Sequence, residues 1–180
     1  MGKIVALVGM CGSGKSVVSE MFEARGYTRI YFGGVTMKEL EKRGLEKCEA
    51  NERKIREELR KTYGQPAFAI LLLDDIQKAS SEGDVILDGL YSWDEYKVLK
   101  DRFKDDLTVV AVVTNSELRY TRLSTRTVRP LTREQAISRD HSEIENLAKG
   151  GPIAIADRYV DNNGDLKDLN NQFENLLISL

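Results

Sequence analysis

The sequence predicts an α/β fold in which a five-stranded parallel sheet lies between two layers of helices, an α/β/α arrangement. Apolar runs of strand length alternate with longer segments of helical periodicity, and this alternation is typical of a parallel sheet covered on both faces. The chain has 180 residues and no repeat or linker that would divide it, so we expect a single domain over residues 1–180. A glycine-rich loop follows the first apolar run, at the edge where parallel sheets hold their ligands.

The first half of the chain begins with a nearly continuous apolar run over residues 3–8, as in a strand buried on both faces. The next segment spaces Val17, Val18, Met21 and Phe22 along one face of a helix. Three helical segments then follow one another, and the second is rich in charges of both signs. We expect a strand over 3–8, a helix over 15–25, a strand over 27–32, helices over 35–43, 46–62 and 65–79, and a strand over 84–88.

The second half contains the clearest strand, residues 107–113, in which β-branched residues dominate. Thr132 is a good N-cap with Gln135 at the capping-box position, and Gly150-Gly151-Pro152 is expected to stop the helix that follows this cap. We expect a helix over 93–103, a strand over 107–113, helices over 117–125 and 133–149, a strand over 155–160 and a helix over 166–177.

Composition narrows the classes of function. A net charge of -2 disfavours a protein built to bind nucleic acid, which usually presents a basic surface. Two cysteines and one histidine give neither a disulfide framework nor a zinc-binding pattern. No apolar run approaches the ~18–20 residues that cross a bilayer, and the first run is too short for a signal peptide. We therefore expect a cytoplasmic protein without a membrane partner, and the sequence leaves the oligomeric state open.

The glycine-rich loop, Gly9-Met10-Cys11-Gly12-Ser13-Gly14-Lys15-Ser16, matches the P-loop pattern G-x-x-x-x-G-K-[ST] at every fixed position. Its glycines allow several backbone N–H groups to surround one anion, and the helix that follows adds the positive end of its dipole. Lys15 is expected to reach the β- and γ-phosphates of ATP, and the Ser16 hydroxyl is expected to bind Mg²⁺. We therefore predict a P-loop NTPase fold with ATP and Mg²⁺ as cofactors, and all eight loop residues as the ATP-binding set.

Three alternatives concern this loop and its surroundings. The P-loop pattern could occur by chance, but its position between an apolar strand and an amphipathic helix argues against a chance match. Cys11 lies inside the loop, either as a small side chain packed toward the sheet or as a redox-sensitive thiol. His141 is the only histidine, and its charged helical surroundings favour a solvent-facing residue over a catalytic one.

Asp88 ends the apolar strand Val85-Ile86-Leu87 and is followed by Gly89. At the carboxyl end of a parallel strand its carboxylate would face the phosphates, where it would bind Mg²⁺ together with Ser16. The alternative is an aspartate that only opens a turn with Gly89. Tyr91 follows closely along the chain and is a candidate to face the acceptor of a phosphoryl group.

Six arginines fall in a short stretch of the chain: Arg119, Arg122, Arg126, Arg129, Arg133 and Arg139. The first three share one helix face, where like charges repel unless an anion lies nearby. An ordinary solvated helix is the alternative, but no acidic residue lies between Arg119 and Arg133. We predict that at least two of the first four contact phosphate, with Arg122 and Arg126 first, because a guanidinium grips phosphate oxygens at two points. Lys15, Arg122 and Arg126 are the predicted catalytic residues, and Arg122 also belongs to the predicted ATP site.

Together the P-loop, the Asp88-Gly89 strand end, the arginine segment and the C-terminal quarter resemble the nucleoside monophosphate kinase group, and within it dephospho-CoA kinases. The closest similarity is in residues 132–136 and 155–166. The chain is also similar to an archaeal branch related to adenylate or dephospho-CoA kinases, for which the resemblance implies no particular acceptor. The similarity covers nearly the whole chain, although only the P-loop is highly specific. It implies a helical acceptor-binding insertion over about residues 34–79, a lid over about 125–131, and a place for Asn162 near the adenine.

The sequence departs from this family after the second strand. Dephospho-CoA kinases carry aspartates there, one of which is taken to activate the sugar hydroxyl, whereas residues 30–35 (IYFGGV) contain none. A hydroxyl acceptor needs a proton acceptor, but a phosphate acceptor is already ionised, so a nucleotide or other phosphorylated metabolite is favoured. Lys38 falls where adenylate kinases usually have an acceptor-binding arginine, and Ser92 replaces another arginine. We predict Lys38, Tyr91 and Arg129 as acceptor-binding residues.

Two functions agree with these features. The first is an ATP-dependent kinase that transfers the γ-phosphoryl group to a small, nucleotide-like acceptor. The second is a regulatory P-loop ATPase whose helical insertion binds protein or RNA, and the charged helix over 46–62 suits either. Transfer of label from ATP to one acceptor would support the first function, whereas slow hydrolysis indifferent to every acceptor would support the second.

Overall fold

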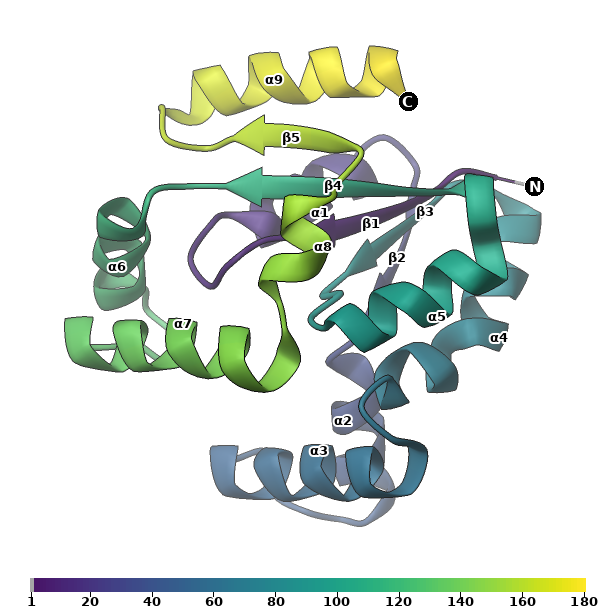
Figure 1. The fold of residues 1–180 in the computed structure, drawn as a ribbon, viewed down its shortest axis with the longest axis vertical. Coiled ribbons are helices and arrows are strands. Elements are labelled where there is room, and N and C mark those ends of the chain that lie inside the picture. Colours follow the sequence, from purple (N-terminus) through teal and green to yellow (C-terminus); the bar gives the residue numbers. More distant parts are fainter. Residues whose placement is uncertain (1) are drawn as a thin grey trace.

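The computed structural model describes residues 2–180, which form one five-stranded sheet with helices on both sides (Figure 1). Its strands are β1 (Ile4–Val8), β2 (Thr28–Tyr31), β3 (Val85–Asp88), β4 (Leu107–Val113) and β5 (Arg158–Asp161). They lie in the order β2-β3-β1-β4-β5, and every neighbouring pair is parallel. The predicted three-layer fold with a five-stranded parallel sheet is therefore confirmed.

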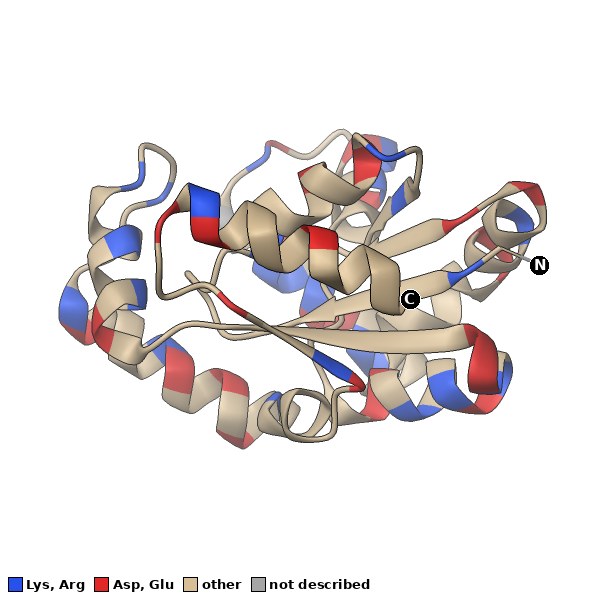
Figure 2. Ribbon diagram, turned by 90° about the horizontal axis from the view of Figure 1, so that it is seen from above, with Lys and Arg blue, Asp and Glu red and all other residues tan. Residues whose placement is uncertain are grey.

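Side chains alternate across β1 and so divide the core into two parts. One face of the sheet packs against α4 (Ala67–Glu82), α5 (Trp93–Phe103) and α8 (Gly150–Ala154), and the other against α1 (Lys15–Glu23) and α9 (Leu166–Ser179). Ile4, Ala6 and Val8 belong to the first part, and Val5 and Leu7 to the second. Figure 2 shows most of the charged residues on helices and loops, while the sheet is mainly tan and carries charge chiefly on β2 and β5. Burial on both faces explains why β1, β3 and β4 are largely apolar without a polar alternation, whereas the edge strands β2 and β5 are more exposed and contain charged residues.

Two segments extend beyond the sheet and its covering helices. α2 (Gly34–Lys42) and α3 (Glu49–Tyr63) lie between β2 and α4, within the segment that the sequence predicts as an insertion. Along the chain, α6 (Ser116–Thr125) and α7 (Arg133–Leu147) follow β4 and precede β5. In space they lie on the side to which the arrows of those strands point (Figure 1). A short 3-10 helix, η1 (Lys104–Asp106), joins α5 to β4. None of the helices described here combines the length and the apolarity that a membrane crossing requires.

The end of α7 differs from the sequence prediction. Thr132 and Gln135 form the predicted capping box at its start, but the helix ends at Leu147 because Ala148 takes a left-handed conformation, with φ 47° and ψ 41°. Gly150, Gly151 and Pro152 form the first residues of a further helix, α8, in addition to following the end of α7. Pro152 is tolerated there because the first turn of a helix leaves its N–H groups without intrahelical partners. β5 consequently begins at Arg158 rather than at residue 155.

Candidate functional site

The carboxyl ends of the strands bring the predicted site residues to one edge of the sheet. β1 leads into the P-loop at Gly9, β3 ends at Asp88, β4 leads to Thr114 and β5 leads to Asn162. Because β1 lies between β3 and β4, the P-loop sits where the strand order reverses, which is the usual ligand position in such sheets. A cavity of about 450 Å³ opens here, and we call it the P-loop cavity. It is lined by Cys11, Gly12, Gly14, Lys15 and Ser16 of the loop, among others.

The backbone of the P-loop requires glycine at particular positions. Gly12 and Gly14 have φ of 81° and 95°, a region that other residues rarely adopt. A Cβ atom on Gly14 would also lie 2.1 Å from Nδ2 of Asn162, and one on Gly12 would lie 2.9 Å from the carbonyl oxygen of Arg119. α1 begins directly at Lys15, and the first N–H groups of a helix have no intrahelical partners. The loop therefore has the geometry that holds an anion with backbone N–H groups.

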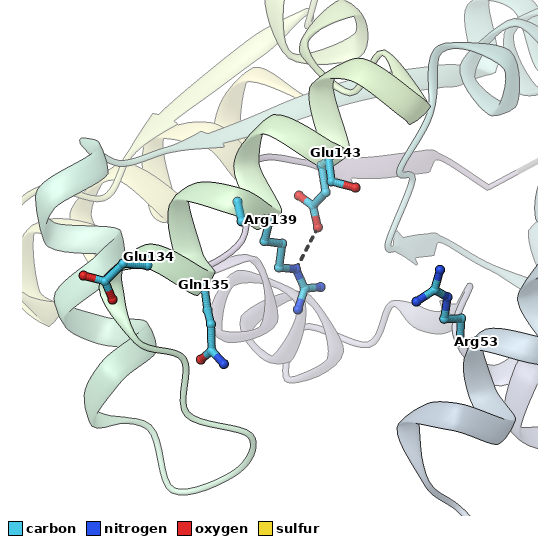
Figure 3. A pocket seen from close by; sticks show the side chains of 7 residues that line it. Arg53, Glu134, Gln135, Arg139 and Glu143 are labelled. Carbon is cyan, nitrogen blue, oxygen red and sulfur yellow. Dashed lines mark hydrogen bonds and ion pairs between the residues drawn. The ribbon is translucent and has the colours of Figure 1, made fainter.

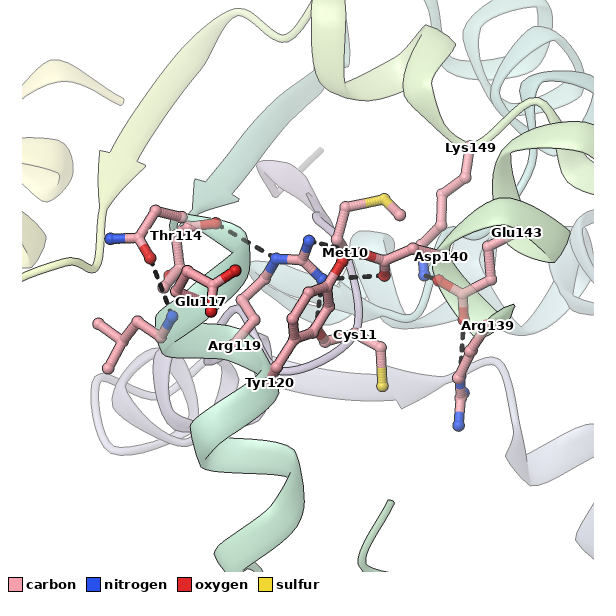
Figure 4. Close-up of polar contacts among 12 residues, drawn as sticks. Met10, Cys11, Thr114, Glu117, Arg119, Tyr120, Arg139, Asp140, Glu143 and Lys149 are labelled. Atoms are coloured by element: carbon pink, nitrogen blue, oxygen red, sulfur yellow. Dashed lines mark hydrogen bonds and ion pairs between the residues drawn. The ribbon is translucent and has the colours of Figure 1, made fainter. Parts of the chain in front are cut away.

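Side chains from other elements hold the carbonyl groups of the loop. The carbonyl oxygen of Ser13 accepts hydrogen bonds from Nδ2 of Asn162 at 2.8 Å and from Oγ1 of Thr114 at 3.1 Å. The carbonyl oxygen of Cys11 accepts a hydrogen bond from Nη1 of Arg119 at 3.0 Å (Figure 4). Asn162 is 6% exposed and does not line the P-loop cavity. The structure thus places Asn162 beneath the loop as a support, rather than on the cavity wall where a direct contact with adenine would be made.

The side chain of Arg119 is held in a buried ion pair. Its Nη1 and Nη2 donate to the two carboxylate oxygens of Asp140 at 2.9 Å and 2.6 Å, and both side chains are buried (Figure 4). Tyr120 adds a hydrogen bond to Asp140 at 3.0 Å. The local excess of positive charge in the sequence is therefore partly balanced by a carboxylate on α7, and Arg119 acts by fixing the P-loop against α6 and α7.

The side chain of Lys15 contacts the backbone of the P-loop. Its Nζ donates to the carbonyl oxygens of Gly9 at 2.7 Å and Met10 at 3.1 Å. Burial and, to a smaller extent, the positive charge of Lys149 lower the pKa of Lys15 to about 7, against the opposing effect of nearby acidic groups. A bound anion would favour the protonated form, so proton uptake and anion binding are coupled at this lysine.

The two residues predicted to bind Mg²⁺ both line the P-loop cavity. Ser16 offers a hydroxyl and Asp88 a buried carboxylate, which are the hard oxygen ligands that Mg²⁺ prefers. Arg29 of β2 forms an ion pair with Asp88 and was not predicted from the sequence. Among the side chains that the structure describes, those of His, Cys, Asp and Glu form no group of three or more that could hold a metal. The donor set fits Mg²⁺ held by few protein ligands together with water and phosphate oxygens.

A second cavity of about 800 Å³ lies beside the first, and we call it the insertion cavity because α2, α3 and α4 contribute to its wall. Phe32 and Phe68 give it apolar surface, and Arg129 of the predicted lid lines it and pairs with Glu52 of α3. Lys38 does not line either cavity. Its side chain is 77% exposed and its Nζ lies 3.7 Å from a carboxylate oxygen of Asp75, so we do not retain it as an acceptor contact.

Of the other predicted residues, Arg122 lines the P-loop cavity, whereas Arg126 and Tyr91 line both cavities. Nε of Arg126 donates to the carbonyl oxygen of Arg129 at 2.6 Å, which ties the end of α6 to the loop that follows. Cys11 is a free, half-buried thiol on the wall of the P-loop cavity rather than a side chain buried against the sheet.

A wide opening of about 870 Å³ separates α7 from Arg53 of α3 (Figure 3). Arg139 and Glu143 line this opening, the P-loop cavity and the insertion cavity, and so lie where the three meet. Glu143 accepts from Nε of Arg139 at 3.0 Å and from Nζ of Lys149 at 2.6 Å (Figure 4). Burial acts to raise the pKa of Glu143, but the two cations outweigh it and hold the pKa below its usual range. The i,i+4 spacing of Arg139 and Glu143 within the predicted helix indicates their ion pair, whereas the spacing of Lys149 carries no signal that groups it with them.

The fold and the P-loop together define a P-loop kinase-like protein. A family model described as an AAA domain matches residues 5–155. The UPF0200 protein of Thermococcus kodakarensis is 35% identical over 179 residues, which covers 97% of this chain and 96% of that relative. The chain belongs to the AAA-domain family defined by this model, and within its sequence relatives to the UPF0200 proteins.

Solved structures of similar fold agree with this class. TT1252 from Thermus thermophilus has a TM-score of 0.69 and 19% identity, and the match covers 99% of this chain and 98% of that one. Dephospho-CoA kinase from Campylobacter jejuni has a TM-score of 0.61 and 16% identity, with 99% and 97% covered. At these identities the similarity concerns the fold alone. The predicted resemblance to P-loop kinases is confirmed at that level.

Proposed function

We propose that this chain is an ATP-dependent phosphotransferase that transfers the γ-phosphoryl group to a small anionic acceptor, a nucleotide or another phosphorylated metabolite. The observation that carries the proposal is the wall shared by the two cavities, which Tyr91, Arg126, Arg139 and Glu143 line from both sides. ATP held by the P-loop and an acceptor in the insertion cavity would meet at this wall. Phosphoryl transfer depends mainly on such positioning and on positive charge around the moving group.

The predicted residues have distinct roles in this proposal. Lys15 and the P-loop N–H groups bind the phosphate tail, and Arg122 and Arg126 stabilise charge on the transferring group from the cavity wall. Ser16 and Asp88 would hold Mg²⁺, which when bound neutralises phosphate charge and bridges phosphate oxygens. Arg126 is the residue best placed to act on both substrates, because it lines both cavities.

The insertion cavity supports an acceptor that combines negative charge with an apolar part. Its aromatic walls suit a ring or other apolar group, and its ionised side chains are mostly cationic. An acceptor with an ionised phosphate oxygen needs no general base, in agreement with the absence of acid in residues 30–35. The charged residues that line the cavity are Lys47, Arg56, Arg60, Arg126, Arg129 and Arg139 on the positive side, and Glu52 and Glu143 on the negative side.

The experiment that tests the proposal incubates the protein with Mg²⁺, γ-labelled ATP and a panel of nucleoside monophosphates plus dephospho-CoA. We expect rapid label transfer to one acceptor, abolished in Lys15→Ala and unchanged in Lys167→Ala, which alters an exposed lysine of α9. Hydrolysis at one slow rate with every acceptor would contradict phosphotransfer and favour the regulatory ATPase. The proposal places the enzyme in the cytoplasm, where ATP and phosphorylated metabolites are present.

A further inference from the structure

We propose that Lys149 contacts the phosphoryl group that is transferred, as a second lysine beside Lys15, and that Glu143 positions it. This inference rests on the proposed function and adds a catalytic residue that lies outside the P-loop motif and outside the arginine segment. In the transfer, the bond from the γ-phosphorus to the ADP oxygen breaks as a bond to an acceptor oxygen forms. Lys149 donates hydrogen bonds to the phosphoryl oxygens and supplies neither a proton nor electrons.

The burial of Lys149 is the first observation. Its side chain is only 2% exposed, although lysine is almost never fully buried unless it is paired. Its Nζ donates to Oε2 of Glu143 at 2.6 Å and lies 4.9 Å from the ring centroid of Tyr91. Lys149 also lines the P-loop cavity, so its ammonium group borders the space beside Lys15 rather than bulk solvent. Two buried ammonium groups on one cavity favour an anionic occupant between them.

The backbone that carries Lys149 is the second observation. Ala148 precedes it in the left-handed conformation, which residues other than glycine avoid and which is often retained at functional sites. The N–H of Lys149 donates to the carbonyl oxygen of Glu143 at 3.3 Å, which closes the turn after α7. Close contact with Trp93 fixes the following segment, since a Cβ atom on Gly151 would lie 2.7 Å from that ring. The sharp turn therefore directs Lys149 back to the edge of the sheet.

The charge around the junction is the third observation. Glu143 bonds both Arg139 and Lys149, so a single carboxylate serves two cations and leaves a net positive charge (Figure 4). Arg139 and Glu143 line both the P-loop cavity and the insertion cavity, which places this charge where the transferring group would pass. If Glu143 took part only in a structural ion pair, one cation would be enough to balance its carboxylate. The surplus charge is what a phosphoryl group with delocalised negative charge requires.

The test compares Lys149→Met, which removes the charge, with Lys149→Arg, which keeps it. The Mg²⁺ complexes of ADP and of a nonhydrolysable ATP analogue are titrated into each protein by calorimetry. For Lys149→Met we expect ADP affinity within about 3-fold of the original and analogue affinity reduced about 10-fold or more, because a charge-assisted hydrogen bond to the γ-phosphate is lost. Lys149→Arg is expected to keep the preference for the analogue over ADP, and Lys167→Met serves as the control.

The possible outcomes separate this inference from the proposed function. If Lys149→Met leaves the ratio of the analogue affinity to the ADP affinity unchanged, the proposed contact with the transferring group is overturned. Binding of both ligands without phosphorylation of any acceptor would contradict phosphotransfer. In that case the ratio of the analogue and ADP affinities would still show whether Lys149 contacts the γ-phosphate. If Lys149→Met does not fold, the side-chain ammonium resonance of Lys149, assigned with Lys149→Arg, is followed in the unaltered protein. A shift with the analogue but not with ADP supports the proposal, and the absence of that difference overturns it.

Discussion

The substitution Gly14→Ala tests whether the P-loop has the geometry described above. A Cβ atom at this position would lie 2.1 Å from Nδ2 of Asn162, and Gly14 has φ of 95°. Gly26 is a matched control, because its φ of 88° imposes a similar backbone cost while nothing lies within 4 Å of the added atom. Comparison of Gly14→Ala with Gly26→Ala therefore isolates the clash from the backbone strain.

The expected magnitudes follow from two contributions. A left-handed conformation costs a residue with a side chain about 1–2 kcal/mol, and this cost is common to both variants. In Gly14→Ala the amide of Asn162 must also move away from the carbonyl oxygen of Ser13, which it now meets at 2.8 Å. Loss of a buried hydrogen bond that leaves a polar group unpaired costs about 1–3 kcal/mol more. We therefore expect a loss of about 2–5 kcal/mol for Gly14→Ala and about 1–2 kcal/mol for Gly26→Ala.

Urea unfolding measures these free energies, and calorimetric titration of Mg-ADP measures the effect on the loop. Gly14→Ala should weaken ADP binding, and Gly26→Ala should leave it unchanged. In the double variant Gly14→Ala/Asn162→Ala the clash is absent, so the two substitutions should destabilise by less than the sum of their separate effects. Equal losses of stability in Gly14→Ala and Gly26→Ala, or strict additivity in the double variant, would refute the described contact.

Three further predictions concern the charged groups of the site. Because the pKa of Lys15 is about 7 in the free protein and a bound phosphate raises it, nucleotide binding at pH 8 should be accompanied by proton uptake and should weaken as the pH rises further. Calorimetry in buffers of different ionisation enthalpy measures this uptake, and no uptake at pH 8 would contradict the prediction. Arg119→Met should lower the free energy of unfolding by about 3–5 kcal/mol, because the buried carboxylate of Asp140 loses its cation and keeps only the hydrogen bond from Tyr120, whereas Arg122→Met should change it by less than about 1 kcal/mol. Similar effects of the two substitutions in urea unfolding would argue against the structural role of Arg119. Arg126→Ala should lower turnover at least ~100-fold with ATP affinity nearly intact, and unchanged turnover would remove Arg126 from the mechanism.

The parts of this structure that depend on local sequence could be predicted from it. The P-loop combines an apolar strand, glycines with positive φ and the start of a helix within a few residues, so residues 4–23 carry the information themselves. The capping box of Thr132 and Gln135 is local in the same way. The parallel direction of the five strands also follows from a general rule for alternating strands and helices.

The contacts that the sequence did not reveal join residues far apart along the chain. Arg29 meets Asp88 only because β2 pairs with β3 in a register that sets Tyr31 against Asp88. Arg119 finds its carboxylate at Asp140 of α7, which lies 21 residues further along the chain, and no local spacing rule joins the two. Lys149 reaches the cavity only through the left-handed turn at Ala148, where the glycines that follow had indicated a simple helix end. These placements are set by tertiary packing, which residue spacing does not encode.

The central claim is that the backbone N–H groups of the P-loop and the ammonium group of Lys15 hold the triphosphate of a nucleotide. Calorimetric titration of Mg-ATP into the folded protein, beside Lys15→Ala under the same conditions, tests it most directly. We expect saturable binding of one ATP per chain, weakened at least ~10-fold by the substitution, because a charged hydrogen-bond donor is removed. Absence of binding by the folded, unaltered protein at millimolar ATP and at millimolar GTP would contradict it.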